Sequence, residues 1–247
     1  LGMHVIDGRG DLLKFGGQVM KNVAGYDVSR LMTGSLGILG LMTQVSLKVL
    51  PVAPARASLR FELSQSEAIQ KVNEWSGRPL PLTASAWEND ILTVRLSGAR
   101  AAVDAAIHTL GGQQMPQAEA DAYWERLRDQ THAFFDASAA GRVGQTLWRL
   151  SLPAVVPAIN ASRIPGADVQ LIEWGGAQRW LWSESDSARI RSVASDLGGH
   201  AVRFNNLQAG DATFETGSPA LMAIHQRLKQ TFDPRGIFNP DRLYQGL

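Results

Sequence analysis

Hydrophobic and polar residues alternate with a period of two in several short runs, which predicts β-strands. The clearest run covers residues 44–49, where every second residue is apolar, and Pro51 ends it. A hairpin is predicted before this run, with residues 3–6 and 12–15 as its strands and 7–10 as its turn. The chain therefore opens with a small antiparallel sheet.

After Pro51, strand patterns are interleaved with helix patterns. Ser64 followed by Glu67 is a capping box, which predicts the start of the first of these helices. Further helices are predicted at residues 99–110, 116–135, 187–197 and 219–232. Strands are predicted at residues 59–63, 82–87, 91–96, 147–152, 169–174, 179–182 and 201–204. This order predicts an α+β fold, an antiparallel sheet with helices on one face.

The composition narrows the classes of function. The 247 residues carry a net charge of only +1 with no basic run, which argues against nucleic acid as a partner. The chain has no cysteine, so disulfides, thiolate metal sites and iron–sulfur ligation are excluded. Five histidines show no metal-site spacing, and no metal is expected. No apolar run reaches the roughly 20 residues of a membrane span.

Residues 16–51 are unusually rich in glycine and carry polar side chains among the glycines. Glycine lets the backbone turn tightly or approach a ligand closely. Two readings follow from the residues alone: a set of turns, or a cradle whose backbone N–H groups bind anionic groups. Asp27 has its own alternative role as the N-cap of a short helix.

The run KNVAGYDVSRLMTGSLGILG, residues 21–40, resembles the FAD-binding domain of the vanillyl-alcohol oxidase and p-cresol methylhydroxylase (PCMH) type. The tail FDPRGIFNPDRL, residues 232–243, resembles the closing motif of that family. The segments LWRLSLP, IEWGGAQRWL and GGHAVRF between them are similar to FAD-binding subunits of bacterial glycolate oxidases. The resemblance covers nearly the whole chain.

The resemblance implies a fold and a set of cofactor contacts. Residues 1–51 would be the C-terminal part of a PCMH-type FAD-binding domain that lacks its N-terminal lobe. Residues 52–205 would be an α+β FAD-linked oxidase C-terminal domain, and residues 206–247 a helix and tail that return to the first domain. The implied FAD-contacting residues are Lys21, Asn22, Gly25, Tyr26, Asp27, Gly34, Ser35, Gly37, Ile38, Gly40 and Asn239.

The resemblance also implies a function. The chain would belong to a multi-subunit enzyme that oxidises glycolate to glyoxylate, together with a sibling flavoprotein subunit and an iron–sulfur subunit. It would be cytoplasmic, or peripheral at the inner membrane through those partners. FAD is expected in the full-length subunit, and weakly bound or absent in this chain alone.

Two alternatives remain open, and no catalytic residue is identified. One is a non-catalytic interaction module with a degenerate flavin site. The other is a self-sufficient FAD-dependent D-2-hydroxy-acid dehydrogenase. His200 lacks the His-x-Gly-Asp-Gly-Asn context that relatives oxidising 2-hydroxy acids carry, which argues against independent substrate oxidation.

Overall fold

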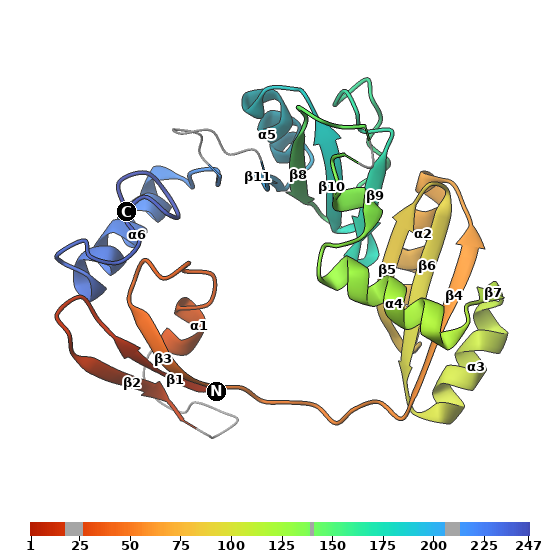
Figure 1. The fold of residues 1–247 in the computed structure, drawn as a ribbon, viewed down its shortest axis with the longest axis horizontal. Helices are drawn as coiled ribbons and strands as arrows, with labels where there is room; N and C mark the ends of the chain where they lie inside the picture. The colour runs from red at the N-terminus through yellow and green to blue at the C-terminus, as the bar shows by residue number, and fades with distance from the viewer. Residues whose placement is uncertain (18–26, 139–140, 206–212) are drawn as a thin grey trace. The chain divides into compact units, whose positions relative to one another are not determined.

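The chain forms two compact units in a computed structural model that describes residues 1–17, 27–138, 141–205 and 213–247 (Figure 1). The first unit is discontinuous and consists of Leu1–Pro51 and Ala212–Leu247. The second unit is the continuous segment Val52–Asp211. The domain boundary that the sequence predicts between residues 205 and 206 lies next to residues 206–212, which the structure does not describe, and it stays a prediction.

The first unit has a three-stranded antiparallel sheet in the order β2 (Leu12–Gly16), β1 (Gly2–Ile6) and β3 (Leu41–Ser46). The predicted hairpin is confirmed as β1 and β2. Two helices complete the unit, α1 (Val28–Leu31) and α6 (Pro219–Phe232). Its buried core draws on both chain segments and consists of Met3, Val5, Met32, Ile38, Leu39, Phe232 and Leu247.

The strand that contains the alternating run at residues 44–49 begins and ends earlier than the pattern predicts. The strand β3 ends at Ser46, and Val45, Leu47 and Val49 are 51%, 76% and 81% exposed. The strand β3 pairs with β1 alone in the described sheet, and none of its residues belongs to the buried core of the first unit. Alternation therefore identified the strand but not a buried face.

The second unit is built on one eight-stranded sheet in which every neighbouring pair is antiparallel. Its strands, in spatial order, are β11 (His200–Arg203), β8 (Thr146–Ser151), β10 (Gln178–Ser183), β9 (Gln170–Glu173), β5 (Leu82–Glu88), β6 (Ile91–Gly98), β4 (Ala55–Glu62) and β7 (Gln113–Gln114). The predicted antiparallel α+β class is confirmed.

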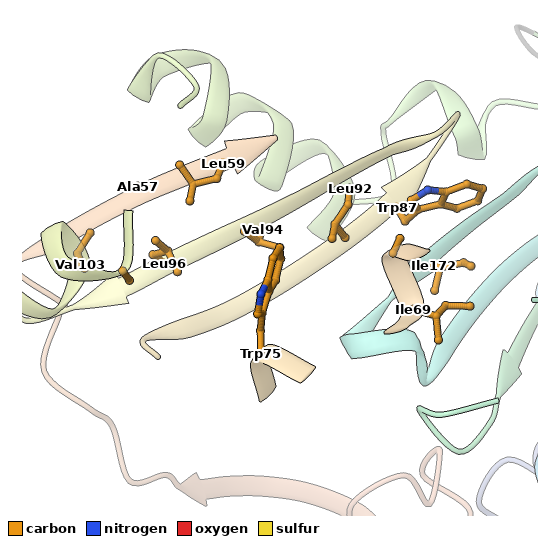
Figure 2. Close-up of a cluster of buried hydrophobic side chains, with 12 residues drawn as sticks. Ala57, Leu59, Ile69, Trp75, Trp87, Leu92, Val94, Leu96, Val103 and Ile172 are labelled. Carbon is orange, nitrogen blue, oxygen red and sulfur yellow. The ribbon is translucent and has the colours of Figure 1, made fainter. Parts of the chain in front are cut away.

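Three helices cover one face of this sheet. The helices α2 (Gln65–Ser76) and α3 (Arg100–Leu110) pack on a core that includes Leu59, Val94 and Trp75, shown in Figure 2. The helix α5 (Ser187–Asp196) packs on the same face over β8, β10 and β11. The capping box that predicted α2 is present, since the Ser64 N–H donates to Glu67 Oε2 at 2.9 Å.

A fourth helix lies on the opposite face, where the sequence reading placed none. Tyr123, Trp124 and Leu127 of α4 (Gln117–Arg128) pack with Ala86 and Trp180, because the strand residues on that side are also partly apolar. The predicted helix over 116–135 was too long. The helix ends at Arg128 because Gln130 adopts a positive φ of 57°. The short 3₁₀ helix η1 (Ala133–Phe135) follows it, and a second one, η2 (Trp174–Gly176), lies later in the chain.

Among the described residues, no helix is long and apolar enough to cross a membrane. All seven tryptophans lie between residues 75 and 182, within the second unit. Tryptophan fluorescence therefore reports on the packing of that unit alone.

We expect Val94→Ala to lower the unfolding free energy of the second unit by about 1–3 kcal/mol, because Val94 is fully buried and its methyl groups leave a cavity. Val155→Ala is the matched control, since Val155 is 73% exposed, and it should change stability by less than about 0.5 kcal/mol. Urea unfolding followed by tryptophan fluorescence measures both. Equal effects of the two variants would contradict this account of the core.

Candidate functional site

The short helix α1 leads into the glycine-rich turn at residues 33–40, here called the glycine turn. Asp27 caps this helix, because its Oδ1 accepts the Arg30 N–H at 3.0 Å and its Oδ2 accepts Arg30 Nε at 2.6 Å. These contacts, first the backbone N–H and then the guanidinium, lower the pKa of Asp27. Asp27 thus has the structural role that its sequence position allowed, and its contact with FAD stays a prediction.

Four of the predicted flavin-contacting residues lie outside the described residues. These are Lys21, Asn22, Gly25 and Tyr26. Their roles stay predictions. The remaining predicted residues, apart from Asp27, lie in the glycine turn or in the tail, and the structure brings these two segments together.

The backbone of the glycine turn is held in a left-handed conformation at three nearby positions. Gly34, Leu36 and Gly37 have φ values of 81°, 51° and 74°. Within the described part of the chain, the N–H groups of these three residues have no protein acceptor. The Ser35 N–H between them is bonded to the Met32 oxygen, so the unpaired successive pair is Leu36 and Gly37, and unpaired N–H groups of this kind suit an anion.

The glycines of the turn differ in why they are needed. A Cβ on Gly37 would lie 2.8 Å from Asn239 Nδ2, and a Cβ on Gly40 would lie 2.7 Å from the Ile6 oxygen. Packing inside the protein therefore explains both without a ligand. A Cβ on Gly34 would meet no atom within 4 Å, so the space beside Gly34 is open.

The open space beside Gly34 belongs to a pocket of about 230 Å³ within the first unit. Ser35 and Ile38, two of the predicted contact residues, line it and are themselves 7% and 3% exposed. The pocket is closed on the other side by His225 and Leu228 of α6. The glycine turn and α6 thus form one concave surface.

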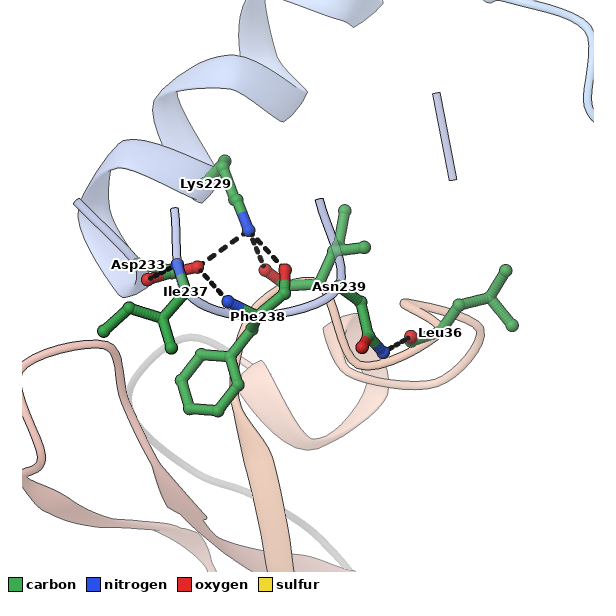
Figure 3. A network of polar contacts seen from close by, with 7 residues as sticks. Leu36, Lys229, Asp233, Ile237, Phe238 and Asn239 are labelled. Atoms are coloured by element: carbon green, nitrogen blue, oxygen red, sulfur yellow. Dashed lines mark hydrogen bonds and ion pairs between the residues drawn. The ribbon is translucent and has the colours of Figure 1, made fainter. Parts of the chain in front are cut away.

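The tail approaches the glycine turn through Asn239. Its Nδ2 donates to the Leu36 oxygen at 2.7 Å, as Figure 3 shows. The helix α6 ends at Phe232, as the Asp-Pro pair predicted, and Asp233 then organises the turn that follows. Its Oδ1 accepts the Ile237 N–H at 3.0 Å and its Oδ2 accepts the Phe238 N–H at 2.8 Å.

A buried lysine, which the sequence reading missed, joins these parts. Lys229 Nζ donates to the Ile38 oxygen at 2.8 Å, the Phe238 oxygen at 2.7 Å and Asp233 Oδ2 at 2.8 Å (Figure 3). The side chains of Lys229 and Asp233 are 11% and 0% exposed. A Lys and an Asp four residues apart at the end of an amphipathic helix are the signal that could have indicated the pair. We call Lys229 and Asp233, with these contacts, the tail clasp.

The tail clasp sets the ionisation of Asp233. Burial raises the pKa of this carboxyl group, but the Lys229 ammonium and the N–H groups of Phe238 and Ile237 lower it by more, so the net pKa lies below the ordinary 3.8. A carboxyl group whose pKa is lower in the folded state stabilises that state above its unfolded pKa. The stabilisation is lost as the pH falls below 3.8 through the folded value.

We expect the amides of Ile237 and Phe238 to lose hydrogen-exchange protection as the pH falls from about 5 to below the folded-state pKa of Asp233, which lies under 3.8, because protonated Asp233 no longer accepts both bonds. Asp233→Asn should weaken protection already at pH 5 and remove most of the change between the two values. Asp104→Asn, at an exposed position of α3, is the control. Hydrogen exchange followed by mass spectrometry, corrected for intrinsic rates, measures the protection of these amides. If Asp233→Asn had the same pH profile as the unaltered protein, Asp233 would not be the group that controls their protection.

The remaining candidate positions do not gather into a catalytic or metal centre. His200 lies exposed at the start of β11. In the described ranges, no group of three or more His, Asp or Glu side chains could hold a metal ion. Among the predicted site residues that the structure describes, it brings together those of the glycine turn and the tail.

Comparisons with known proteins agree with this picture. The family described as FAD linked oxidases, C-terminal domain, matches residues 209–243, which include α6 and the tail clasp. Glycolate oxidase subunit GlcE of Escherichia coli (strain K12) is 45% identical over all 247 residues, and the chain spans 65% of its length. Glycolate oxidase subunit GlcD of Bacillus subtilis (strain 168) is 39% identical over 59 residues, 24% of this chain and 13% of that protein.

The fold is shared with a solved enzyme structure. Alkyldihydroxyacetonephosphate synthase matches 98% of this chain and 54% of its own with a TM-score of 0.53, at 13% identity. At that identity the likeness concerns the fold alone. By sequence, the chain is similar to glycolate oxidase subunit GlcE over all of its 247 residues, and residues 209–243 match the C-terminal domain of the FAD linked oxidases.

Proposed function

We propose that this chain is the part of a glycolate oxidase subunit that holds one side of an FAD. The full-length match to subunit GlcE supports the enzyme class. The observation that carries the cofactor is the glycine turn, whose Gly34, Leu36 and Gly37 N–H groups have no acceptor in the described protein. Such groups fit the polar, negatively charged parts of a dinucleotide.

The residues of the first unit would divide the work of holding the cofactor. The N–H groups of the glycine turn would bind oxygen atoms, and Lys21 would offset negative charge. Asn239 Nδ2 donates a hydrogen bond to the Leu36 oxygen, and we expect this side chain to lie beside the cofactor. When bound, FAD would carry electrons that come from the sibling flavoprotein subunit, and this chain would supply binding and orientation.

The chain alone should hold FAD weakly. The pocket beside the glycine turn measures about 230 Å³, whereas sites for ligands well below the size of FAD measure roughly 300–1,000 Å³. Its walls would therefore contact only part of the cofactor. Most binding contacts must come from elsewhere in the assembled enzyme.

We further propose that the chain works beside other subunits. A sibling flavoprotein would oxidise glycolate to glyoxylate, and an iron–sulfur subunit would accept electrons. The exposed His200 and the lack of a metal-ligand group among the described residues favour this division over a self-sufficient D-2-hydroxy-acid dehydrogenase. The assembly would be cytoplasmic or would reach the inner membrane through its partners.

Gly34→Asn tests the flavin function. Asparagine tolerates the positive φ of Gly34, and its side chain would enter open space, so the fold should be kept while a ligand is displaced. We expect the purified, assembled enzyme to lose most of the flavin bound to this subunit. Flavin released by denaturation, measured per protein by absorbance, gives the result.

The matched control is Gly141→Asn in the second unit, where φ is 64° and a Cβ also meets no atom within 4 Å. It should keep its flavin. If Gly34→Asn folds and also keeps its flavin, the glycine turn is a turn only, and the chain is better described as an interaction module.

Asn239→Ala should have a milder effect than Gly34→Asn. It removes one hydrogen bond, to the Leu36 oxygen, whose net worth is about 0.5–1.5 kcal/mol. Because this bond lies within the protein, FAD affinity of the assembled enzyme should fall by no more than about twelvefold. Titration of FAD into flavin-depleted enzyme, followed by flavin fluorescence, checks this; a loss larger than that of Gly34→Asn would contradict it.

A further inference from the structure

The second unit contains an open cleft of about 810 Å³. Its lining includes Trp124 and Trp180, which belong to the core under α4, and also Val72 and Ser76 of α2, from the other face of the sheet. Arginines of the two neighbouring strands β4 and β6, Arg56 and Arg95, also line it. The cleft is formed within one unit and is separate from the glycine turn.

The two arginines are neighbours of like charge. Arg95 lies opposite Ser58 in the strand register, two residues along β4 from Arg56, so both side chains leave the same face of the sheet. Arg95 is desolvated by burial, and its pKa is lowered by this and by the charge of Arg56. Neither guanidinium forms an ion pair with any described carboxylate.

The contacts that Arg95 does make are neutral. Its Nε donates to Thr83 Oγ1 at 3.1 Å, and its guanidinium lies over the ring of Trp124 at 5.4 Å from the centroid. The stacking fixes the plane of the guanidinium. Its other nitrogens remain available to an acceptor in the cleft.

The acidic residues of the cleft are mostly engaged elsewhere. Glu173 Oε2 accepts Gln178 Nε2 at 3.1 Å and Trp180 Nε1 at 2.7 Å. Glu125 is bonded by Arg128. Asp121 is the acid that attracts Arg95, but its Oδ1 accepts Gln117 Nε2 at 2.9 Å and it forms no ion pair with Arg95. The three arginines and three acids that line the cleft balance in formal charge, and Arg56 and Arg95 are the two of these arginines that have no described carboxylate at ion-pair distance.

An exposed tryptophan stands on the same cleft. Trp174 lines it, is 73% exposed and has a φ of 52°, a conformation that bulky residues rarely adopt. The turn is held rigidly, since the Gly175 N–H donates to Ser85 Oγ at 2.9 Å and Asn73 Nδ2 donates to the Gly175 oxygen at 3.1 Å. A strained backbone that presents a large ring to solvent indicates a contact surface.

We propose that this cleft binds a small organic anion with a flat aromatic or conjugated ring. The anionic group would accept hydrogen bonds from Arg56 and Arg95, and the ring would lie on Trp174. Guanidinium groups suit carboxylates in this way because they offer paired N–H donors. The site is independent of the proposed flavin function and uses none of its residues.

The size of the cleft supports a ligand larger than a two-carbon acid. Its volume of about 810 Å³ lies within the range of sites for drug-sized ligands, roughly 300–1,000 Å³. A two-carbon acid would occupy only a small fraction of it. A ring of naphthalene size fills more of the space and removes the exposed face of Trp174 from water.

The test is calorimetric titration of the protein with 2-naphthoate at low ionic strength. We expect binding that is about tenfold weaker in Arg56→Gln and in Arg95→Gln, since each removes a charge-assisted hydrogen bond. Trp174→Asn, which keeps the positive φ, should weaken binding similarly. Arg100→Gln, at an exposed position on α3, should bind as the unaltered protein does.

Two further ligands separate the parts of the proposal. The neutral 2-naphthamide should bind at least about tenfold more weakly, because it lacks the charge. Acetate should also bind more weakly, because it lacks the ring. Arg95→Gln loses the stacking on Trp124, so thermal unfolding is used to check that this variant is folded. Arg56 makes no such contact, so Arg56→Gln tests the role of the charge without this loss of packing.

Three results would overturn the proposal. They are the absence of heat with 2-naphthoate at millimolar concentration, unchanged affinity in a folded Arg56→Gln, and acetate binding as tightly as 2-naphthoate. The last would show a site for small acids without an aromatic contact.

Discussion

The first unit depends on one buried ammonium group. Lys229 is almost fully enclosed, and a charge removed from water is tolerated only if its hydrogen-bonding capacity is filled. Its three protons have three acceptors, one each on the glycine turn, the tail and the end of α6. Because these acceptors come from three segments, the hydrogen bonds of the Lys229 ammonium hold the glycine turn, the tail and the end of α6 in fixed positions relative to one another.

The shape of the candidate cofactor site follows from that constraint. Holding the Phe238 oxygen places Asn239 beside the turn, where its side chain takes the Leu36 oxygen. With the carbonyl groups of Ile38 and Leu36 both directed to the tail, the adjacent N–H groups of the turn are left without protein partners. The left-handed φ of Leu36, costly for a residue with a branched side chain, is held in place by the same bond. The carbonyl groups of the glycine turn thus bind the tail, while its unpaired N–H groups remain available to a ligand.

Sequence reasoning succeeded where the signal is local. The Ser64 capping box, the first hairpin and the stop of α6 at Asp233 each depend on a few adjacent residues, and the structure contains all three. It failed where the outcome depends on distant partners. The alternation in β3 could not reveal that the strand lies at an edge, and the apolar face of 116–135 could not reveal the turn at Gln130.

The candidate site shows the same limit more sharply. The spacing of the glycines indicated the turn. However, a side chain at position 37 is excluded by Asn239, 202 positions away in the sequence, and one at position 40 is excluded by the end of β1. Lys229 gave no sign that its main partner would be the Ile38 oxygen, 191 positions earlier. The link to flavin came from family resemblance, because no periodicity states what an unpaired N–H group binds.

This long separation also bears on how the first unit forms. Its two segments are divided by the whole of the second unit, so the bond between Asn239 and Leu36 closes a loop of 203 residues. Each doubling of a flexible loop adds about 0.6 kcal/mol to the cost of closure. A second unit that folds first, as a continuous segment with its own cores, replaces most of that loop by a compact body. The cost of bringing Lys229 to the glycine turn is then lowered, and the tail clasp forms on a chain that is already largely ordered.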